Sequence, residues 1–318
     1  MSAATTQVRP VPGDAVVPAG KRLRYGGTYG SRATPYLFLL PYLVLFVTFV
    51  AVPAVFGIWI SLHNWDFLLP GKPFVGLENY TALFDPESVQ FYPFWNGIQA
   101  TAIFTVASVP LLILIPLGLA VLLNRHFPGR TFFRAVFFAP YVLGVAVIGL
   151  MWRYLLDPSF GAVNGLLNLV GLPSVNWITE QPWAWISLVA VTVWWTTGFN
   201  AIIYLAGLGE IPGEQYEAAE LDGASRLQQF RHVTLPGLRP VMIFVITTTI
   251  LASANMFGQS YLITQGAPGD STRTAIIEIT ERGLSQYRMG EAAAMSYLLA
   301  VMLGVVAGLS FYLLREKK

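Results

Sequence analysis

Residues 36–62 read YLFLLPYLVLFVTFVAVPAVFGIWISL, an apolar stretch without one charged side chain. A hydrocarbon core about 30 Å thick is crossed by roughly 20 helical residues, because each residue adds about 1.5 Å along the axis. The stretch is therefore long enough to span a membrane. It is too long for the apolar part of a cleaved signal peptide and follows a polar segment, so it predicts a retained transmembrane helix.

The same pattern recurs along the chain. Of the 318 residues, 55% are hydrophobic and 11% are charged, a balance that soluble globular proteins do not normally have. Proline and glycine within such stretches are common in membrane helices, where neighbouring helices satisfy the freed backbone groups. We predict an all-α integral membrane protein with six transmembrane helices, of which five follow the first: 98–123, 135–152, 184–207, 241–262 and 292–314.

The segments between the spans are short, so the domain organisation is simple. Residues 1–34, rich in Pro, Gly and Ala, predict a flexible tail, and residues 35–318 predict one transmembrane domain. Cytoplasmic segments of membrane proteins carry an excess of Lys and Arg. Placing the N-terminus inside puts 14 of the 19 Lys and Arg residues in the cytoplasm. We therefore expect both termini to be cytoplasmic.

The six predicted spans contain no Asp, Glu, Lys, Arg or His. Ion-coupled carriers ordinarily need such a group within the membrane, so an ion-coupled secondary sugar transporter is only the alternative interpretation. No metal-ligand spacing, phosphate-binding glycine loop or catalytic constellation is found, and cysteine is absent from the sequence. We expect no metal and no enzyme activity in this chain, with a membrane-embedded transferase as a third interpretation. A net charge of +2 does not favour nucleic acid as a partner.

Neutral polar side chains distinguish the fourth and fifth predicted spans. Thr196 and Asn200 lie in the fourth span, and Ser253, Asn255 and Gln259 lie in the fifth. Amides and hydroxyls form hydrogen bonds with a polyol, and aromatic rings stack on the apolar faces of sugars, so the cluster suits a saccharide. The same groups also bind helices to one another, for a fraction of a kcal/mol to about 2 kcal/mol each. For any single residue, that structural role is favoured.

The loop 208–240, between these two spans, concentrates acidic residues. After a turn at Pro212, Glu214, Glu217 and Glu220 recur every three residues and share one face of a predicted helix. The helix dipole stabilises anions only in the first turn, by about 0.3–1 kcal/mol, so it does not explain the whole set. Two explanations stay open: a solvated charged face, or a surface that binds a basic partner.

The residues that follow resemble a known motif. Residues 217–236, EAAELDGASRLQQFRHVTLP, are similar to the EAA loop of permease subunits in ATP-binding cassette importers. The family pattern is E-A-A, three residues, Gly, nine residues and I-x-L-P, and this chain departs from it at Val233, which keeps a β-branched side chain. The resemblance implies that the ATPase-coupling residues are Glu214, Glu217, Ala218, Ala219, Asp222, Gly223, Arg226, Phe230, Leu235 and Pro236.

Nearly the whole chain after residue 33 resembles the MalF-type sugar permeases. The segments that carry this likeness include FVGLENYTALF (74–84), FFRAVFFAPYVLGVAVIGLMWRYL (132–155) and LITQGAPGDSTRT (262–274). The resemblance implies the MetI-like permease fold of type I importers. It also implies a substrate pathway that includes Thr196, Phe199, Asn200, Asn255, Met256 and Gln259.

The resemblance implies partners as well. A second, MalG-type permease would form the other half of the pathway in a bacterial or archaeal cytoplasmic membrane, and an extracytoplasmic solute-binding protein would deliver the sugar. Two ATPase subunits would bind ATP and Mg and grip one EAA loop each, so this chain would hold no cofactor itself. Glu217 would be the carboxylate in the ATPase cleft, and Gly223 would form the turn between two coupling helices.

Overall fold

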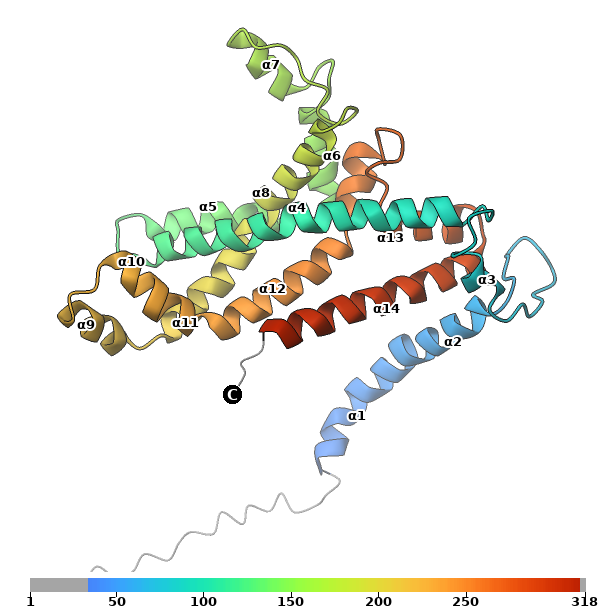
Figure 1. Cartoon of the computed structure of the whole chain (residues 1–318), viewed down its shortest axis with the longest axis horizontal. Coiled ribbons are helices and arrows are strands. Elements are labelled where there is room, and N and C mark those ends of the chain that lie inside the picture. The colour runs from blue at the N-terminus through green and yellow to red at the C-terminus, as the bar shows by residue number, and fades with distance from the viewer. Residues whose placement is uncertain (1–33, 315–318) are drawn as a thin grey trace, which may run out of the picture. The chain divides into compact units, whose positions relative to one another are not determined.

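The computed structural model describes residues 34–314 of the chain. Within these residues the chain divides into two units, with the boundary between Ala54 and Val55. In the first unit, the described residues form α1 (Thr34–Phe46), the π-helical turn η1 (Val47–Ala51) and the start of α2 (Val52–Ser61), drawn in blue in Figure 1. The predicted tail at 1–34 lies outside the described residues, apart from Thr34, where α1 begins.

The helical segment Tyr36–Ser61 corresponds to the first predicted span. The most apolar 18 consecutive residues of this segment have a mean hydropathy of 2.6, and none of these residues is buried. A helix that is hydrophobic on every side requires an apolar environment around it. This segment is therefore suited to a bilayer rather than to water.

The second unit is a bundle of helices, and residues 34–314 contain isolated bridges but no strand. Three single helices, α4, α8 and α14, match predicted spans and are long and apolar enough to cross a membrane. The elements after α2 are α3 (Glu78–Thr81), α4 (Phe91–Asn124), α5 (Arg130–Val142), α6 (Val145–Leu155), α7 (Ala162–Leu169), α8 (Trp183–Glu210), α9 (Gly213–Leu221), α10 (Arg226–Gln229), η2 (Phe230–Thr234), α11 (Leu235–Gly237), α12 (Arg239–Ala254), η3 (Ser260–Thr264), α13 (Ala275–Thr280), η4 (Glu281–Ser285) and α14 (Met289–Leu314).

Helix α4 organises this bundle. It packs against α8, α12 and α13, while α5 packs against α8 (Figure 1). The approach of α4 to α13 depends on Gly97, because a Cβ at this position would lie 2.9 Å from the Cα of Ala275. Small residues of this kind let membrane helices come close enough for dispersion contacts to hold them together.

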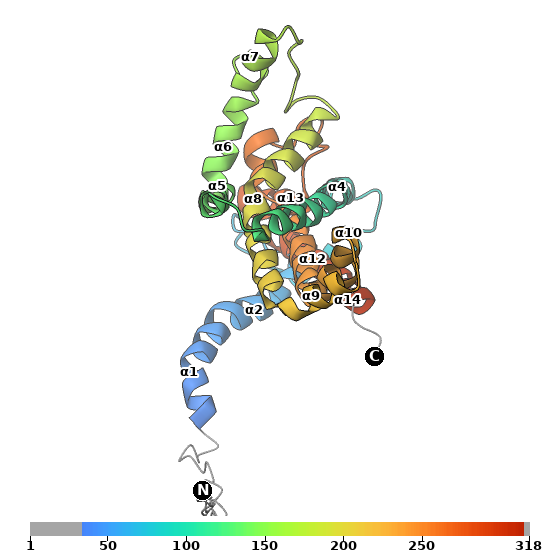
Figure 2. The same cartoon turned by 90° about the vertical axis from the view of Figure 1, so that its left-hand side faces the viewer.

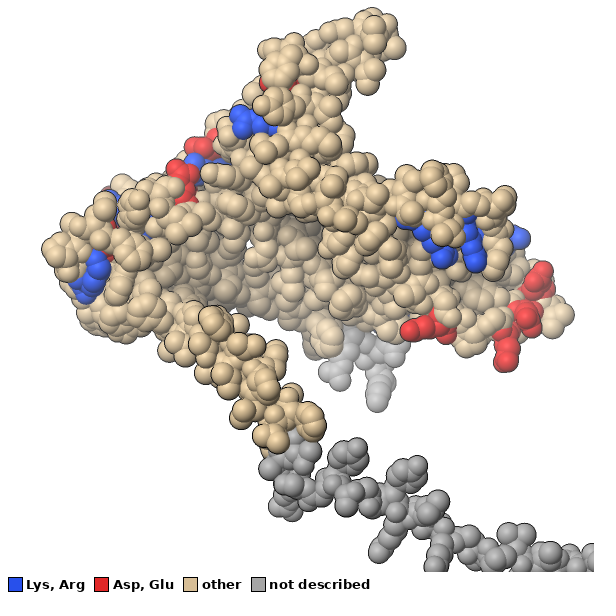
Figure 3. Space-filling model, turned by 180° about the vertical axis from the view of Figure 1, so that it is seen from behind, with Lys and Arg blue, Asp and Glu red and all other residues tan. Residues whose placement is uncertain are grey.

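Helix α8 connects two opposite ends of the unit. Figure 1 shows α6 and α7 near the start of α8, and α9, α10 and α11 gathered near its end; Figure 2 shows α7 at the end of the unit opposite to α9 and α10. On the face seen in Figure 3, charged side chains lie at the margins and a broad uncharged surface separates them. An apolar middle between charged ends is the distribution that a bilayer requires.

Two of the six predicted spans are not single straight helices. The stretch predicted at 135–152 bends by 95° between α5 and α6. The helix predicted at 241–262 starts at Arg239 but ends at Ala254, and η3 begins only at Ser260. A further bend, of 69°, lies outside these two spans: it separates α10–α11 from α12, where the chain leaves the loop 208–240.

At each of the first two breaks, a side chain from another part of the chain supplies a compensating hydrogen bond. At the first break, Leu143 and Gly144 adopt extended backbone conformations. The carbonyl of Leu143 accepts a hydrogen bond from Nε1 of Trp195 at 3.1 Å. The carbonyl of Met256, at the second break, accepts one from Oγ1 of Thr274 at 2.8 Å. Side chains thus satisfy backbone groups that a bilayer would leave unpaired.

Candidate functional site

A cavity of about 410 Å³ lies where the two broken helices meet α4 and α8. Its lining comes from α4, from the α5–α6 bend, from α8, and from α12 with the segment that follows it. No Asp, Glu, Lys, Arg or His lines the cavity. Breaks in membrane helices expose backbone groups and mark binding sites in many transporters, so the position of this cavity is significant.

All six residues that the resemblance assigns to the pathway line this cavity: Thr196, Phe199, Asn200, Asn255, Met256 and Gln259. Asn200 is buried, and its Nδ2 donates to the carbonyl of Leu112 at 2.9 Å and to Oγ1 of Thr249 at 3.3 Å. Oγ1 of Thr196 donates back to the carbonyl of Thr192 at 2.8 Å. Asn200 therefore joins α8 to α4 and α12, as the structural interpretation expects, whereas the Thr196 bond lies within α8, and both side chains also line the cavity.

Two other amides are better placed to meet a ligand. Asn255 is exposed, and its Nδ2 donates to the carbonyl of Leu251 at 2.8 Å, which leaves Oδ1 as an acceptor. Gln259 is half-buried, and its amide forms no hydrogen bond with any residue in the described range 34–314. A partly desolvated amide with unused donor and acceptor capacity suits a hydroxyl-rich ligand.

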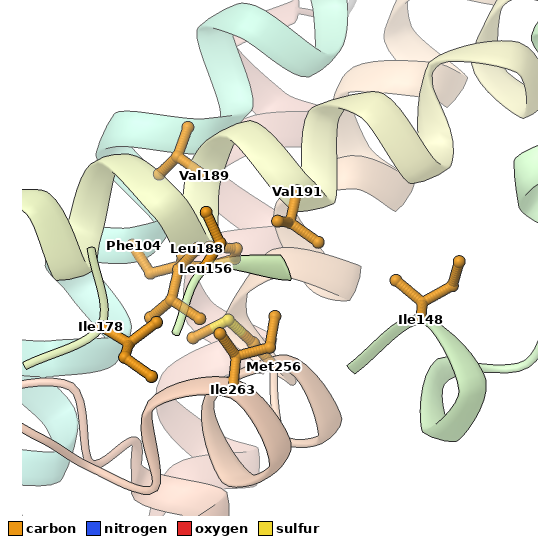
Figure 4. Packing of buried hydrophobic residues seen from close by; sticks show 9 residues of the cluster. All are labelled: Phe104, Ile148, Leu156, Ile178, Leu188, Val189, Val191, Met256 and Ile263. Carbon is orange, nitrogen blue, oxygen red and sulfur yellow. The ribbon is translucent and has the colours of Figure 1, made fainter. Parts of the chain in front are cut away.

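Met256 differs from the other five because its side chain belongs mainly to the core. It is only 3% exposed and packs in a cluster with Phe104, Leu188 and Ile263. Figure 4 shows Met256 and Ile263 next to each other in this cluster. Met256 therefore forms the apolar floor of the cavity, where it contributes shape rather than hydrogen bonds.

An aromatic wall is the part of the cavity that sequence reasoning missed. The rings of Tyr141 and Phe199 stack, with centroids 4.5 Å apart and planes 17° from parallel, and Trp195 lies beside Tyr141. Tyr141 reaches Phe199 because α5 crosses α8 at Gly198, where a Cβ would lie 2.1 Å from the carbonyl oxygen of Phe137. The glycine before Phe199 was the available signal, but an unbroken helix over 135–152 gave no reason to choose Tyr141.

The loop 208–240 folds into a helical knob, which we define as α9, α10, η2 and α11. Helix α9 ends in a Schellman motif, in which Ala224 N–H donates to the carbonyl of Ala219 at 2.9 Å and Gly223 N–H to that of Glu220 at 3.0 Å. Gly223 has φ of 76°, a left-handed conformation that glycine adopts without strain. Ser225 and Gln228 then form a capping box that starts α10.

The assigned coupling residues divide between the surface and the base of the knob. Phe230 and Leu235 are half-buried against a cluster that contains Tyr204 and Leu238. Tyr216 and Thr234 share a hydrogen bond of 3.0 Å that ties α9 to η2. Ala219 is half-buried, and the remaining assigned residues are exposed: Glu214, Glu217, Ala218, Asp222, Gly223, Arg226 and Pro236.

The exposed surface of the knob has the composition of a contact surface. Glu214, Glu217 and Glu220 form no ion pair with any described residue. Leu221, which follows Glu220 in α9, is 90% exposed, and Leu227 of α10 is 60% exposed. A solvated charged face explains the acids but not two large apolar side chains held out in water.

A buried ionic cluster was also missed, because it lies between the fifth and sixth predicted spans, where no site residue was predicted from the sequence. Glu278 is 2% exposed and accepts from Nε of Arg273 at 3.0 Å and from Nη2 of Arg282 at 3.2 Å. Arg282 also approaches Glu291 at 3.5 Å. The spacing of four between Glu278 and Arg282 was the available signal. None of these residues lines the cavity, and no His, Cys, Asp and Glu group among the described residues is placed to hold a metal.

The comparisons with known proteins identify the family. Residues 113–318 match the family described as binding-protein-dependent transport system inner membrane component. The chain belongs to this family. It is therefore a multi-pass membrane transport component.

The relatives of this permease carry names that agree. It is 32% identical over 275 residues to the trehalose/maltose transport system permease protein MalF of Thermococcus litoralis, covering 86% of this chain and 92% of that protein. It is 33% identical over 314 residues to the arabinooligosaccharides transport system permease protein AraP of Bacillus subtilis, covering 97% and 96%. Among solved structures, a bacterial ABC transporter involved in the import of the acidic polysaccharide alginate matches with a TM-score of 0.77 and 25% identity, over 88% of this chain and 94% of that chain.

Proposed function

We propose that this chain is the permease subunit of an ATP-binding cassette importer that moves a neutral sugar or related polyol across the cytoplasmic membrane. ATP hydrolysis occurs in a separate subunit, and this chain is not an enzyme. The observation that carries the substrate class is the cavity at the two helix breaks, which is polar and aromatic but uncharged. The sugar transport relatives support the same class.

The lining of the cavity suits a saccharide in three respects. The stacked pair of Tyr141 and Phe199 offers a flat apolar surface for a sugar ring. The free groups of Asn255 and Gln259 offer hydrogen bonds to hydroxyls. A volume of about 410 Å³ falls in the range of small-molecule sites, roughly 300–1,000 Å³, and the partner permease supplies the opposite wall.

The knob is the coupling element. Its acids need basic counterparts and its exposed Leu221 needs an apolar one, and a cleft in the ATPase subunit supplies both. ATP and Mg bind in the ATPase dimer, whose closure moves the spans only if it grips the knob differently in its open and closed states. Glu217 enters the cleft, and Gly223 sets the angle between α9 and α10.

The remaining assignments follow from this arrangement. The knob and both termini are cytoplasmic, and residues 35–318 form the transmembrane domain. A MalG-type permease completes the pathway, and an extracytoplasmic solute-binding protein delivers the sugar. The family description, which names binding-protein-dependent transport, supports that last partner.

The test uses the absence of cysteine from the sequence, which makes any introduced cysteine unique. Glu217→Cys, with a bifunctional cross-linker in membranes that hold the neighbouring gene products, is expected to capture a nucleotide-hydrolysing protein. Glu87→Cys is the matched control, since Glu87 is also exposed but lies just before α4, far along the chain from the knob. Reconstituted vesicles should then take up the sugar that the solute receptor binds, and only with ATP inside the compartment that contains the ATPase.

Three results contradict the proposal. Capture of the ATPase from Glu87→Cys but not from Glu217→Cys places the coupling surface elsewhere. Uptake that persists after ATP depletion and follows a proton or sodium gradient supports the ion-coupled alternative. Labelling of Glu217→Cys by an impermeant maleimide from the periplasmic side reverses the orientation.

A further inference from the structure

A second cavity, of about 200 Å³, lies between the end of α4 and the knob. We name it the basic pocket and define it by its polar lining residues: Asn124, Arg125, Tyr216, Arg226, Gln229 and Thr234. Asn124 is the last residue of α4 and Arg226 is the first of α10, so the pocket joins a membrane span to the knob. The cavity that we assign to the sugar shares no lining residue with it.

The charge of the basic pocket is unbalanced. Arg125 and Arg226 come from different elements, and neither forms an ion pair with a described residue. No Asp or Glu lines the pocket. Two guanidinium groups that converge on one cavity repel each other, and an anion between them removes this repulsion. Both side chains are exposed, so a ligand can reach them.

The donors around the two arginines favour a phosphate group. Guanidinium groups bind phosphate oxygens with two parallel hydrogen bonds, and the amides of Asn124 and Gln229 add neutral donors. Nε2 of Gln229 already donates to the carbonyl of Ala224, but at 3.3 Å, a long bond that a charged acceptor can replace. A carboxylate has only two oxygens to accept hydrogen bonds from these arginine and amide N–H groups. A phosphate has more acceptor oxygens, so it can bind more of the donors at once.

The depth of the pocket indicates where the phosphate comes from. Val121 and Leu208, from the last turns of α4 and α8, form its apolar side, and the polar residues follow directly. This is the level at which a span leaves the hydrocarbon and meets lipid headgroups. Basic pockets between helices at this level bind anionic headgroups, with about 1 kcal/mol contributed by each Lys or Arg near the surface.

We propose that the basic pocket binds the phosphate headgroup of an anionic membrane lipid and thereby clamps the end of α4 to the knob. This step rests on the proposed function, in which the knob transmits the movement of the ATPase. The bound lipid then makes the contact between α4 and the knob more rigid. ATP hydrolysis is then coupled to uptake more tightly in anionic membranes than in zwitterionic ones.

The test measures lipid binding first, without reference to transport. The full chain is purified in detergent with the subunits that accompany it, and retained phosphatidylglycerol is titrated by native mass spectrometry against phosphatidylcholine. Arg125→Gln is expected to weaken phosphatidylglycerol binding about fivefold, the factor that corresponds to one surface arginine. Arg125→Lys should retain most of the binding. Arg130→Gln is the matched control, because it removes the same charge from the same segment but lies outside the pocket.

Further arms separate the alternatives. Inorganic phosphate should compete with phosphatidylglycerol in the wild type and lose this effect in Arg125→Gln. Phosphate that binds while the lipid does not overturns the lipid source. Equal losses in Arg125→Gln and Arg130→Gln overturn the pocket, since they indicate a general surface charge effect. If Arg125 instead pairs with an acidic residue of the ATPase, Arg125→Gln weakens the complex and leaves lipid affinity unchanged, which also overturns the proposal.

The transport arm follows in vesicles of phosphatidylcholine with or without phosphatidylglycerol. The ratio of sugar imported to ATP hydrolysed should rise with phosphatidylglycerol in the wild type and in Arg130→Gln, and should not rise in Arg125→Gln. A failure of the proposed function appears as no uptake in any membrane, while the binding titration still reports on the pocket. A ratio that rises equally in all three proteins contradicts the clamp.

Discussion

Gly198→Ala tests the crossing that places Tyr141 against Phe199. A Cβ at position 198 would lie 2.1 Å from the carbonyl oxygen of Phe137 and 2.7 Å from the Cα of Phe138, both backbone atoms of α5. Ordinary contact begins near 3.4 Å, so the first distance is about 1.3 Å too short. A side-chain rotation does not relieve a clash with backbone, and α5 must therefore move away from α8 by roughly 1 Å.

The structure allows the cost to be estimated. Overpacking of this kind costs about 1–3 kcal/mol, which lowers the apparent melting temperature by roughly 5 °C for about 2 kcal/mol in a unit of this size. The same displacement separates the rings of Tyr141 and Phe199, whose stacking contributes about 1 kcal/mol. If a sugar uses this wall during passage, the maximal uptake rate falls about fivefold.

The assay compares Gly198→Ala with Gly209→Ala, which lies on the same helix with no atom within 4 Å of the added Cβ. The control should be neutral or slightly stabilising, because alanine is the better helix former. Melting is followed in detergent, and uptake is measured at saturating loaded solute receptor so that receptor affinity does not limit the rate. If Gly198→Ala and Gly209→Ala have the same melting temperature and the same uptake rate, then α5 and α8 have room for an added methyl group. That result would contradict the close crossing that places Tyr141 against Phe199.

Three further changes test other parts of the structure. Gly223→Asp places a side chain on a residue with φ of 76° between α9 and α10, so the chain should still insert and the ATPase subunit should still hydrolyse ATP while uptake is lost; unchanged uptake refutes this. Arg282→Gln removes a cation from buried Glu278 and should cost about 3 kcal/mol, whereas Arg288→Gln, whose side chain is 50% exposed, should cost less than about 1 kcal/mol, as thermal melting will show. Tyr141→Leu keeps the bulk of the wall but removes its flat face, so uptake at saturation should fall while melting changes by less than in Gly198→Ala, and equal uptake argues against ring stacking.

The spans were predictable where their composition alone decides the structure. The stretches 36–62, 98–123, 184–207 and 292–314 correspond to continuous helical segments, since a long uncharged segment has few other folds available in a bilayer. The prediction of a span averages hydropathy over many residues, so an error of one or two helical turns at an end does not change the number of spans. Helix α4, for example, begins several residues earlier than expected.

The breaks were not predictable, because the residues that cause them act only through tertiary partners. Pro110 and Pro116 both lie inside α4, which remains continuous, whereas the chain bends at Leu143, which has no unusual propensity. The bend is stable because Trp195 supplies the missing hydrogen bond from another helix. A single sequence shows the proline and the glycine but not the distant donor, so it does not tell a kinked span from a broken one.

The polar residues of the candidate site were predictable, because a polar side chain within a membrane span is energetically unfavourable unless it has a partner or a function. Neutral polar residues within a span need partners, and this requirement brings Asn200 and Thr249 together across α8 and α12, whereas Asn255 and Gln259 keep unused hydrogen-bonding groups at the cavity. Aromatic residues carry no such requirement, since Tyr141 is equally at home at a lipid interface or in a binding wall. Their role follows from the crossing angle of helices, which the sequence expresses only through a glycine such as Gly198.

The position of the knob in the chain connects it directly to the cavity. It is inserted between α8 and α12, the two helices whose polar faces line the cavity, and Asn200 bonds to Thr249 directly across them. The apolar cluster at the base of the knob includes Tyr204 and Leu208 of α8 together with Val245 of α12. A packed base of this kind transmits displacement rather than absorbing it, because close-packed side chains are poorly compressible. A partner that moves the knob therefore changes the angle between the two helices on which the cavity is built, with no separate transmission element required.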